Sequence, residues 1–434
     1  MDLTLEIVGQ IPKRRLIPRG PTGDRLLDEI ESWLRAGGSE LVRGTRRPDP
    51  GAGDPVLAVA FHPAAAEVVV RASKDGRVVV SAVTSAVGPG YHTYLCTLVE
   101  RLGAELGIAW SPIGTPDGSR DDAAAFEAAD QPGGRRAAAE RGHLAWLGKT
   151  LGSVRQARSS GARGVQVGLP VGVRYGFDGA LATPLGPRDD AWLDRALADP
   201  RIAIDILPWW ADATDGRFLL NRAVTLMWTQ VRWRSPGLEG ERELLDEVAQ
   251  GLWRAHPLDP GLPFPWPEWQ EILVLRDVDD PASRLVAERA ARPGDERPSI
   301  GYRREPVTIV HAGWALPVPG SFGERRSDEE WWGGEGGRSV TLAGVETGTA
   351  QGPMSADAFL DQVSGDLGTQ ALMHRSGPVK ARARLTAEGS SGVDVGVLDG
   401  YAAITGRGAA IRIEFADPTD YQWALDTWRS LAPA

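Results

Sequence analysis

Apolar side chains recur at intervals of three and four residues in several stretches of the chain, the spacing that gives a helix one hydrophobic face. Residues 220–231 follow this template without a miss, and residues 245–252 form a second stripe of the same kind. The pattern predicts a mostly helical region over residues 135–288. Two more helices are expected at about residues 24–35 and 91–106.

Shorter apolar or alternating runs predict strands in the first quarter of the chain. Residues 56–61 form a compact apolar run, and two alternating runs, 67–73 and 77–84, flank a turn that contains Asp75 and Gly76. Because an Asp-Gly pair suits the left-handed turn of a hairpin, the two alternating runs are expected to pair with each other. Two further strands are expected at residues 108–110 and 165–173.

The order of these elements predicts a multi-domain α+β protein. In a chain of 434 residues, the N-terminal region, 1–298, is expected to hold three parts: an α+β block over 1–112, an exposed acidic connection over 113–134, and the mostly helical part over 135–288. A polar stretch broken by prolines follows it, as is typical of a domain boundary. Residues 299–434 are predicted to form a small C-terminal α+β domain.

The C-terminal domain has a recognisable order of elements. Strands are expected at 307–310, 314–318 and 339–345, a helix from Ser355, and three more strands at 379–386, 392–398 and 409–415, before a last helix that carries Trp423 and Trp428. This order of a β-rich segment, a helix, three strands and a helix resembles the small PsbP/Mog1-like α+β architecture. The resemblance implies a fold for about 130 residues and leaves the function open.

Charge and composition exclude several classes of partner. The net charge is −10, so the chain repels a polyanion on average and nucleic acid is not an expected partner. Residues 78–99 carry no Asp, Glu, Lys or Arg, but Gly88, Pro89 and Gly90 interrupt them, which predicts a strand, a turn and a helix instead of a membrane span. The first residues are acidic where an export signal needs basic ones. With Cys96 as the single cysteine, a cytoplasmic protein is expected.

The Gly88–His92 turn is the first candidate site. Gly88 and Gly90 stand at a predicted helix start, where backbone amides attract anions, and His92 follows in the first turn. This composition supports an alternative function, an enzyme that acts on a small anionic substrate. A pocket that joins His92 to acids would favour that alternative, and the acids considered are Asp205, Asp212 and Asp215.

Cys96 lies four residues after His92 on the same helix, so the pair has the composition of a nucleophile and its base. Leu95, Leu98 and Val99 surround Cys96 in the sequence, which favours a structural role for the thiol in the core. The six histidines are scattered and show no metal-ligand spacing, so neither a metal nor a cofactor is expected.

Tryptophan is the unusual component, with 16 residues against six tyrosines and eight phenylalanines. Trp209 and Trp210, like Trp331 and Trp332, lie outside any amphipathic stripe and beside acidic residues. Both pairs are therefore expected to be exposed and to contact a partner. Trp253 adjoins a helical stripe and is expected to pack in the core.

These features predict a protein-interaction module without an assembled catalytic site. The expected partner is another protein, and the oligomeric state stays open. Carbohydrate binding through tryptophan platforms is a weaker hypothesis, because no export signal is seen. The proline-rich residues 257–269 are interpreted as a stiff connector whose aromatic side chains pack on the same chain.

Overall fold

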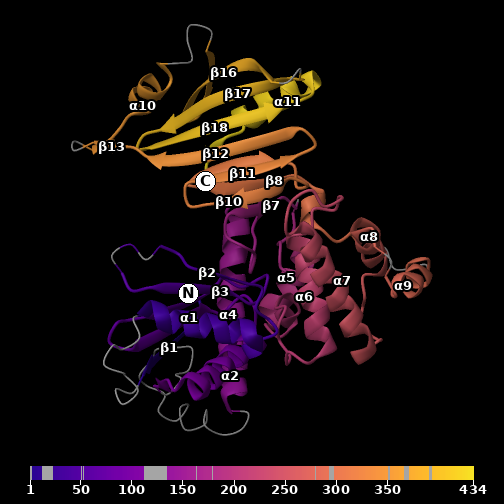
Figure 1. The fold of residues 1–434 in the computed structure, drawn as a ribbon. Coiled ribbons are helices and arrows are strands. Elements are labelled where there is room, and N and C mark those ends of the chain that lie inside the picture. Colours follow the sequence, from indigo (N-terminus) through magenta and orange to yellow (C-terminus); the bar gives the residue numbers. More distant parts are fainter. Residues whose placement is uncertain are drawn as a thin grey trace. The chain divides into compact units, whose positions relative to one another are not determined.

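The computed structural model describes residues 2–11, 23–49, 51, 53–111, 134–162, 164–177, 179–278, 280–292, 298–349, 352–365, 371–390 and 393–434. The chain forms a mixed α+β structure with an N-terminal antiparallel sheet, a helical middle and C-terminal antiparallel sheets (Figure 1). Residues 113–133 of the predicted acidic connection lie outside the described residues.

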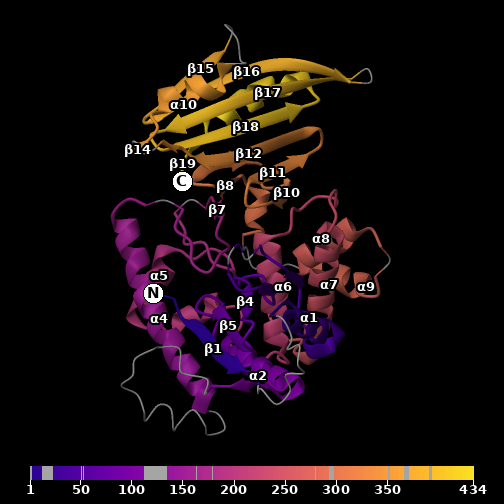
Figure 2. The same cartoon turned by 60° about the vertical axis from the view of Figure 1, so that its left-hand side comes forward.

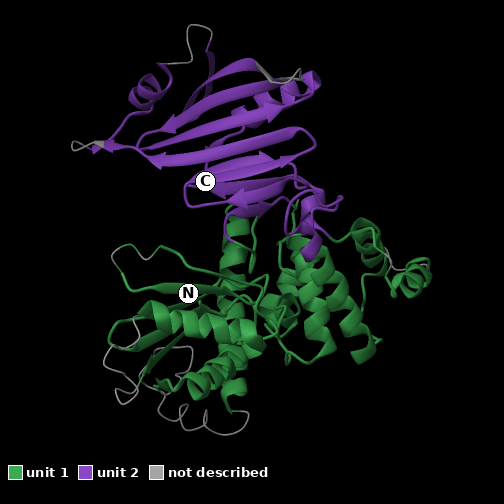
Figure 3. Cartoon of the chain, in the orientation of Figure 1, with its two compact units in different colours: residues 1–170, 177–230, 244–300 green, residues 171–176, 231–243, 301–434 purple. Residues whose placement is uncertain are grey.

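The chain divides into two compact units (Figure 3). Unit 1 consists of residues 1–170, 177–230 and 244–300. Unit 2 consists of residues 171–176, 231–243 and 301–434. Unit 2 therefore takes in two short segments from the predicted helical region as well as the whole of the C-terminal part from residue 301.

Unit 1 contains a six-stranded antiparallel sheet in the order β2-β3-β4-β5-β1-β6. The predicted hairpin is confirmed as the β4–β5 pair, and Gly76 has a φ of 85° in its turn. The first strand, β1, was not predicted and lies between β5 and β6, with β4 and β5 beside it in Figure 2. The strands are β1 (Thr4–Gln10), β2 (Gly44–Arg46), β3 (Val56–Ala60), β4 (Val68–Ala72), β5 (Arg77–Val83) and β6 (Ala109–Trp110).

Helices cover this sheet and build the rest of unit 1. The two predicted apolar stripes lie in α6 and α7, with Val231 just beyond the end of α6, and their residues are buried except for the half-buried Val224. Helix α1 packs on β3 and β4, and α2 packs against α4. The helices are α1 (Gly23–Trp33), α2 (Pro89–Leu106), α4 (Gly134–Ser159), α5 (Asp190–Ala198), α6 (Gly216–Thr229), α7 (Glu241–Leu258), α8 (Trp266–Arg276) and α9 (Ser283–Ala290).

Two local predictions have different outcomes. Residues 78–99 do form a strand, a turn and a helix, and among the described residues no helix has the length and apolarity needed to cross a membrane. The strand predicted over 165–173 is wrong, because the structure has only an isolated bridge at Gln166 and a short β7 (Val173–Tyr175). Gly168 and Gly172 adopt φ values of 71° and 100°, and this left-handed backbone interrupts a strand.

Unit 2 holds two antiparallel sheets, seven-stranded in the order β10-β11-β12-β18-β17-β16-β15 and four-stranded in the order β19-β9-β8-β7. The structure adds β10, β11, β13, β14, β15 and β19 to the predicted strands. The strands after β7 are β8 (Val307–His311), β9 (Trp314–Val318), β10 (Gly323–Arg326), β11 (Glu330–Glu335), β12 (Arg338–Glu346), β15 (Leu372–Ser376), β16 (Val379–Ser390), β17 (Val393–Ile404), β18 (Arg407–Phe415) and β19 (Ala432–Pro433), with a small β13–β14 pair (Gly348–Thr349, Gly352–Pro353).

The two helices of unit 2 lie against glycines of the large sheet. Phe359 of α10 (Ala356–Val363) occupies the space above Gly408, and Trp428 of α11 (Tyr421–Arg429) occupies the space above Gly400. Gly400 pairs with Ile411, three residues from Gly408, so the two aromatic rings lie on opposite faces of the sheet.

Candidate binding groove

The Gly88–His92 turn is closely packed by the chain itself. The backbone amide of Gly90 donates to the carbonyl of Trp209 at 3.1 Å. A Cβ added at Gly88 would lie 2.4 Å from that carbonyl oxygen, and one at Gly90 would lie 2.3 Å from the carbonyl oxygen of Ala211. The two glycines are therefore required by the close approach of residues 209–211, and these contacts argue against an anion site at this helix start.

His92 is buried in this packing. Its Nδ1 lies 3.3 Å from the hydroxyl of Thr84, and the backbone carbonyl of Thr84 lies 3.1 Å from Nε2 of His143. Burial, together with smaller effects of the nearby His143 and Arg135, lowers the pKa of His92 to about 4. The imidazole is therefore neutral at physiological pH.

Cys96 is fully buried on the same helix, as the sequence predicts. Burial raises the pKa of its thiol to about 11, so the thiolate needed for a nucleophile does not form near pH 7. The acids considered as partners of His92 have other contacts: Asp205 accepts a hydrogen bond from Trp192 at 3.2 Å, and Asp215 caps α6. The side chain of Asp212 is 87% exposed.

The exposure predicted for the tryptophan pairs is wrong for Trp209 and Trp331, which are both fully buried. Trp209 forms the centre of an aromatic cluster, with ring centroids 4.2 Å from Phe218, 5.1 Å from Tyr94 and 5.4 Å from Tyr91. Trp331 points into the core from β11, and its indole N–H donates to Glu324 at 3.1 Å. Tertiary packing buries both residues although neither belongs to a helical stripe.

The second member of each pair is half-buried. The carbonyl of Trp210 accepts a hydrogen bond from Arg136. Trp332 lines a cleft of about 380 Å³ in unit 2, together with Arg234, Leu238 and Arg338 among others. The structure therefore places Trp332 at a surface cavity.

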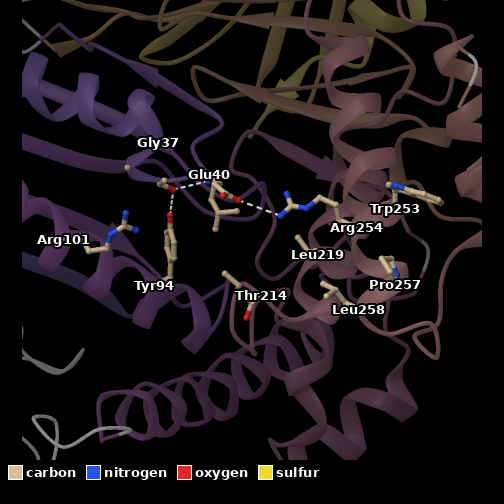
Figure 4. Close-up of a pocket in the computed structure, with 14 residues that line it drawn as sticks. Gly37, Glu40, Tyr94, Arg101, Thr214, Leu219, Trp253, Arg254, Pro257 and Leu258 are labelled. Carbon is tan, nitrogen blue, oxygen red and sulfur yellow. Dashed lines mark hydrogen bonds and ion pairs between the residues drawn. The ribbon is translucent and has the colours of Figure 1, made fainter. Parts of the chain in front are cut away.

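Another cavity among the described residues is a groove of about 790 Å³ in unit 1, which we call the Trp253 groove (Figure 4). It lies between the turn that follows α1, the middle of α2, the loop before α6, and the last turns of α7. Its lining residues are Gly37, Gly38, Ser39, Glu40, Leu41, Tyr94, Arg101, Ala213, Thr214, Leu219, Trp253, Arg254, Pro257 and Leu258.

One side of the Trp253 groove is apolar. Trp253 is 45% exposed and Leu258 is 58% exposed, so both present apolar surface to solvent at the end of α7. Leu219 of α6 is 8% exposed and lies between them and the α2 side in Figure 4. The position of Trp253 corrects the sequence prediction, which placed this residue in the core.

The other side of the Trp253 groove is polar. The hydroxyl of Tyr94 is hydrogen-bonded to that of Ser39, and burial raises the pKa of Tyr94 above its usual value, so the phenol stays neutral. Arg254 extends from α7 toward Glu40, with 3.9 Å between the charged groups (Figure 4). Arg101 stands above the ring of Trp33, with its guanidinium carbon 5.8 Å from the ring centroid.

Packing at the end of α7 holds the apolar rim in place. His256 lies edge-on to Phe264 and Trp266, with ring centroids 5.4 and 5.5 Å away, and Trp266 stacks on Trp269 at 5.3 Å. The aromatic residues of the proline-rich segment thus pack on their own chain, as the connector interpretation predicts.

Comparison with known proteins yields no family for this chain: no family model matches, and no curated protein matches. Solved structures do match, among them a 1.50 Å crystal structure from Bacteroides thetaiotaomicron VPI-5482, with 6% identity and a TM-score of 0.24. That match covers 28% of this chain and 45% of the other chain. A similarity of this size carries no argument about function, so the groove is interpreted from its own residues.

Proposed function

We propose that the protein is an interaction module without catalytic activity, and that it binds a short segment of another protein in the Trp253 groove. The observation that carries this proposal is the exposed apolar rim, Trp253 and Leu258, at the edge of a cavity of about 790 Å³. Tryptophan and arginine are the residue types that most often dominate binding energy at protein interfaces, and this groove offers both.

The size of the groove supports a short segment as its occupant. Cavities that bind small ligands measure roughly 300–1,000 Å³, which is also room for a few residues of an extended chain. Binding the flat face of a folded protein would need a broad exposed surface, and the groove is a concave cavity instead. The proposed partner is therefore a protein that inserts a few residues between α2 and α7.

The single cysteine and the contacts of His92 bear on the compartment and on the enzymatic alternative. Cys96 is a buried free thiol, which suits a reducing compartment, and we place the interaction in the cytoplasm. The enzymatic alternative at the Gly88–His92 turn gains no support from the contacts of His92 and Cys96 described above. The PsbP/Mog1-like architecture of the C-terminal region stays a prediction and has no part in this proposal.

The proposal is tested by selecting binders from a phage-displayed library of random twelve-residue peptides on the full chain. Each selected peptide is then synthesised and its affinity is measured for the native protein, for Trp253→Ala and for Val274→Ala. Val274 is 70% exposed on α8 and does not line the groove, so it is the matched control. We expect peptides whose binding needs Trp253 and is unaffected at Val274. Selection that returns only peptides indifferent to Trp253 would overturn the proposal.

A further inference from the structure

We infer that the segment bound in the Trp253 groove is acidic: it places an Asp or Glu carboxylate against Arg101 and an apolar side chain, from another residue of the same segment, against Trp253. This inference rests on the proposed function and adds the chemistry of the partner. It is carried by the distribution of charge in and beneath the groove.

The groove is locally basic in an acidic protein. Its lining holds two arginines, Arg101 and Arg254, and one acid, Glu40, while the whole chain has a net charge of −10. A positive site on a negative protein attracts an anionic group and guides it to that one place.

The layer beneath the groove adds to this positive charge. Arg222 lies close enough to Tyr94 to lower the pKa of its hydroxyl, against the larger effect of burial. Arg222 and Arg43 share a single acid, Glu247, at 2.8 and 3.1 Å. In each of these two groups of described residues, two arginines therefore face one acid.

Arg101 is available to a ligand. Its contact is with the face of Trp33, and within the described part of the chain it has no carboxylate within 4.0 Å. An incoming acid can pair with Arg101 without breaking an ion pair between residues that the structure describes. The Trp33 ring also holds the guanidinium in position, which reduces the entropy lost on binding.

The second arginine of the groove, Arg254, forms only a long, exposed ion pair. Arg254 and Glu40 are 3.9 Å apart, with side chains that are 56% and 83% exposed. Such an exposed pair contributes little stability, so Arg254 can turn toward a ligand at small cost. Tyr94, between the two arginines in Figure 4, stays neutral and does not repel a carboxylate.

An apolar surface and a basic surface line the same groove, with Trp253 and Arg101 at opposite ends of it in Figure 4. Leu258 and Trp253 offer surface for an apolar side chain on one wall of the groove. Arg101 of α2 lines the opposite wall. A segment that carries both an apolar residue and an Asp or Glu can contact both walls. A purely apolar segment leaves Arg101 desolvated without a partner, and a basic segment meets like charge.

The test uses the peptides selected on the native protein. We expect Asp or Glu to be enriched in those peptides that depend on Trp253. Replacing that acid by its amide should weaken binding to the native protein by about tenfold, the usual size of one charge-assisted hydrogen bond. The same replacement should change binding to Arg101→Gln by less than about twofold, because the partner of the acid is gone.

Arg284→Gln is the matched control, since this arginine is 92% exposed on α9, outside the groove, and should give the native result. Peptides that depend on Trp253 but show no acid enrichment, or an equal loss on both proteins when the acid becomes an amide, would overturn the inference and leave the proposed function standing. A selection without peptides that depend on Trp253 overturns both.

Discussion

Two tryptophans of unit 1, Trp209 and Trp253, show how one residue type can serve opposite purposes. Trp209 is fully buried, and its ring lies 4.2 Å from Phe218 while its carbonyl meets the start of α2. Trp253 is 45% exposed on the rim of a groove. The first joins a loop, a helix start and an aromatic core, so it stabilises the fold. The second presents apolar surface that the fold itself leaves uncovered, which is why we propose it as a binding residue.

The largest effect should come from Trp209→Ala. Removing a buried indole leaves a cavity and takes away the packing of the aromatic cluster, so the free energy of unfolding should fall by about 3–5 kcal/mol. Urea denaturation followed by circular dichroism measures this change. A loss below about 1 kcal/mol would show that the cluster around Trp209 does not hold unit 1 together.

Gly90→Ala tests the same region from the helix side. The added Cβ would lie 2.3 Å from the carbonyl oxygen of Ala211, a backbone atom that has to move, so we expect a loss of about 1–3 kcal/mol. Gly152→Ala in α4 is the control, because nothing lies within 4 Å of its added Cβ. There alanine should stabilise the helix by up to about 1 kcal/mol. Equal effects at the two positions would contradict the close packing at the turn.

Acid should destabilise this buried region through His92. Its pKa is about 4 in the folded protein and about 6.5 in the unfolded chain, so between these values only the unfolded chain binds the proton. The free energy of unfolding should therefore fall by about 1.4 kcal/mol per pH unit as the pH decreases through this window, or about 2 kcal/mol from pH 7 to pH 5. Burial lowers the pKa of His143 and His62 in the same sense.

Urea unfolding of the native protein and His92→Gln at several pH values isolates this contribution. The difference between the two stabilities should shrink as the pH falls from 7 to 5. If the difference between the two free energies of unfolding does not depend on pH, His92 is accessible to protons in the folded state. That result would support the enzymatic alternative.

The sequence carries enough signal for the regular elements of this fold. Periodic stripes predict α6 and α7, and the Asp-Gly turn predicts the β4–β5 hairpin. The strand β1 was missed although Leu5 and Ile7 alternate with polar residues, so a period-two search of the first residues would have found it. Strand β11 was missed because its acidic and glycine residues hide the alternation that buries Trp331 and leaves Trp332 half-buried.

The hydrophobic pattern of the sequence does not predict the candidate site. Leu252 and Trp253 are neighbours on α7, yet Leu252 is fully buried and Trp253 is 45% exposed. One residue turns a side chain by about 100° around a helix, and whether another element covers that direction depends on distant parts of the chain. Glu40, Tyr94 and Arg254 share no local motif, since three separate segments bring them to one groove.

The smallest effect on stability should come from Trp253→Ala. An exposed side chain on a helix contributes little packing, and alanine favours the helix, so the free energy of unfolding should change by less than about 1 kcal/mol. Urea denaturation beside Trp209→Ala measures the contrast between the two tryptophans directly. A loss as large as that of Trp209→Ala would make Trp253 a structural residue.

The most direct test of the account is the affinity of a selected peptide for folded Trp253→Ala, measured by fluorescence anisotropy. If the groove binds a partner through this indole, the dissociation constant should rise by at least about thirtyfold, as for a dominant interface residue, while Val274→Ala keeps the native value. An unchanged dissociation constant for the folded Trp253→Ala protein would contradict the account.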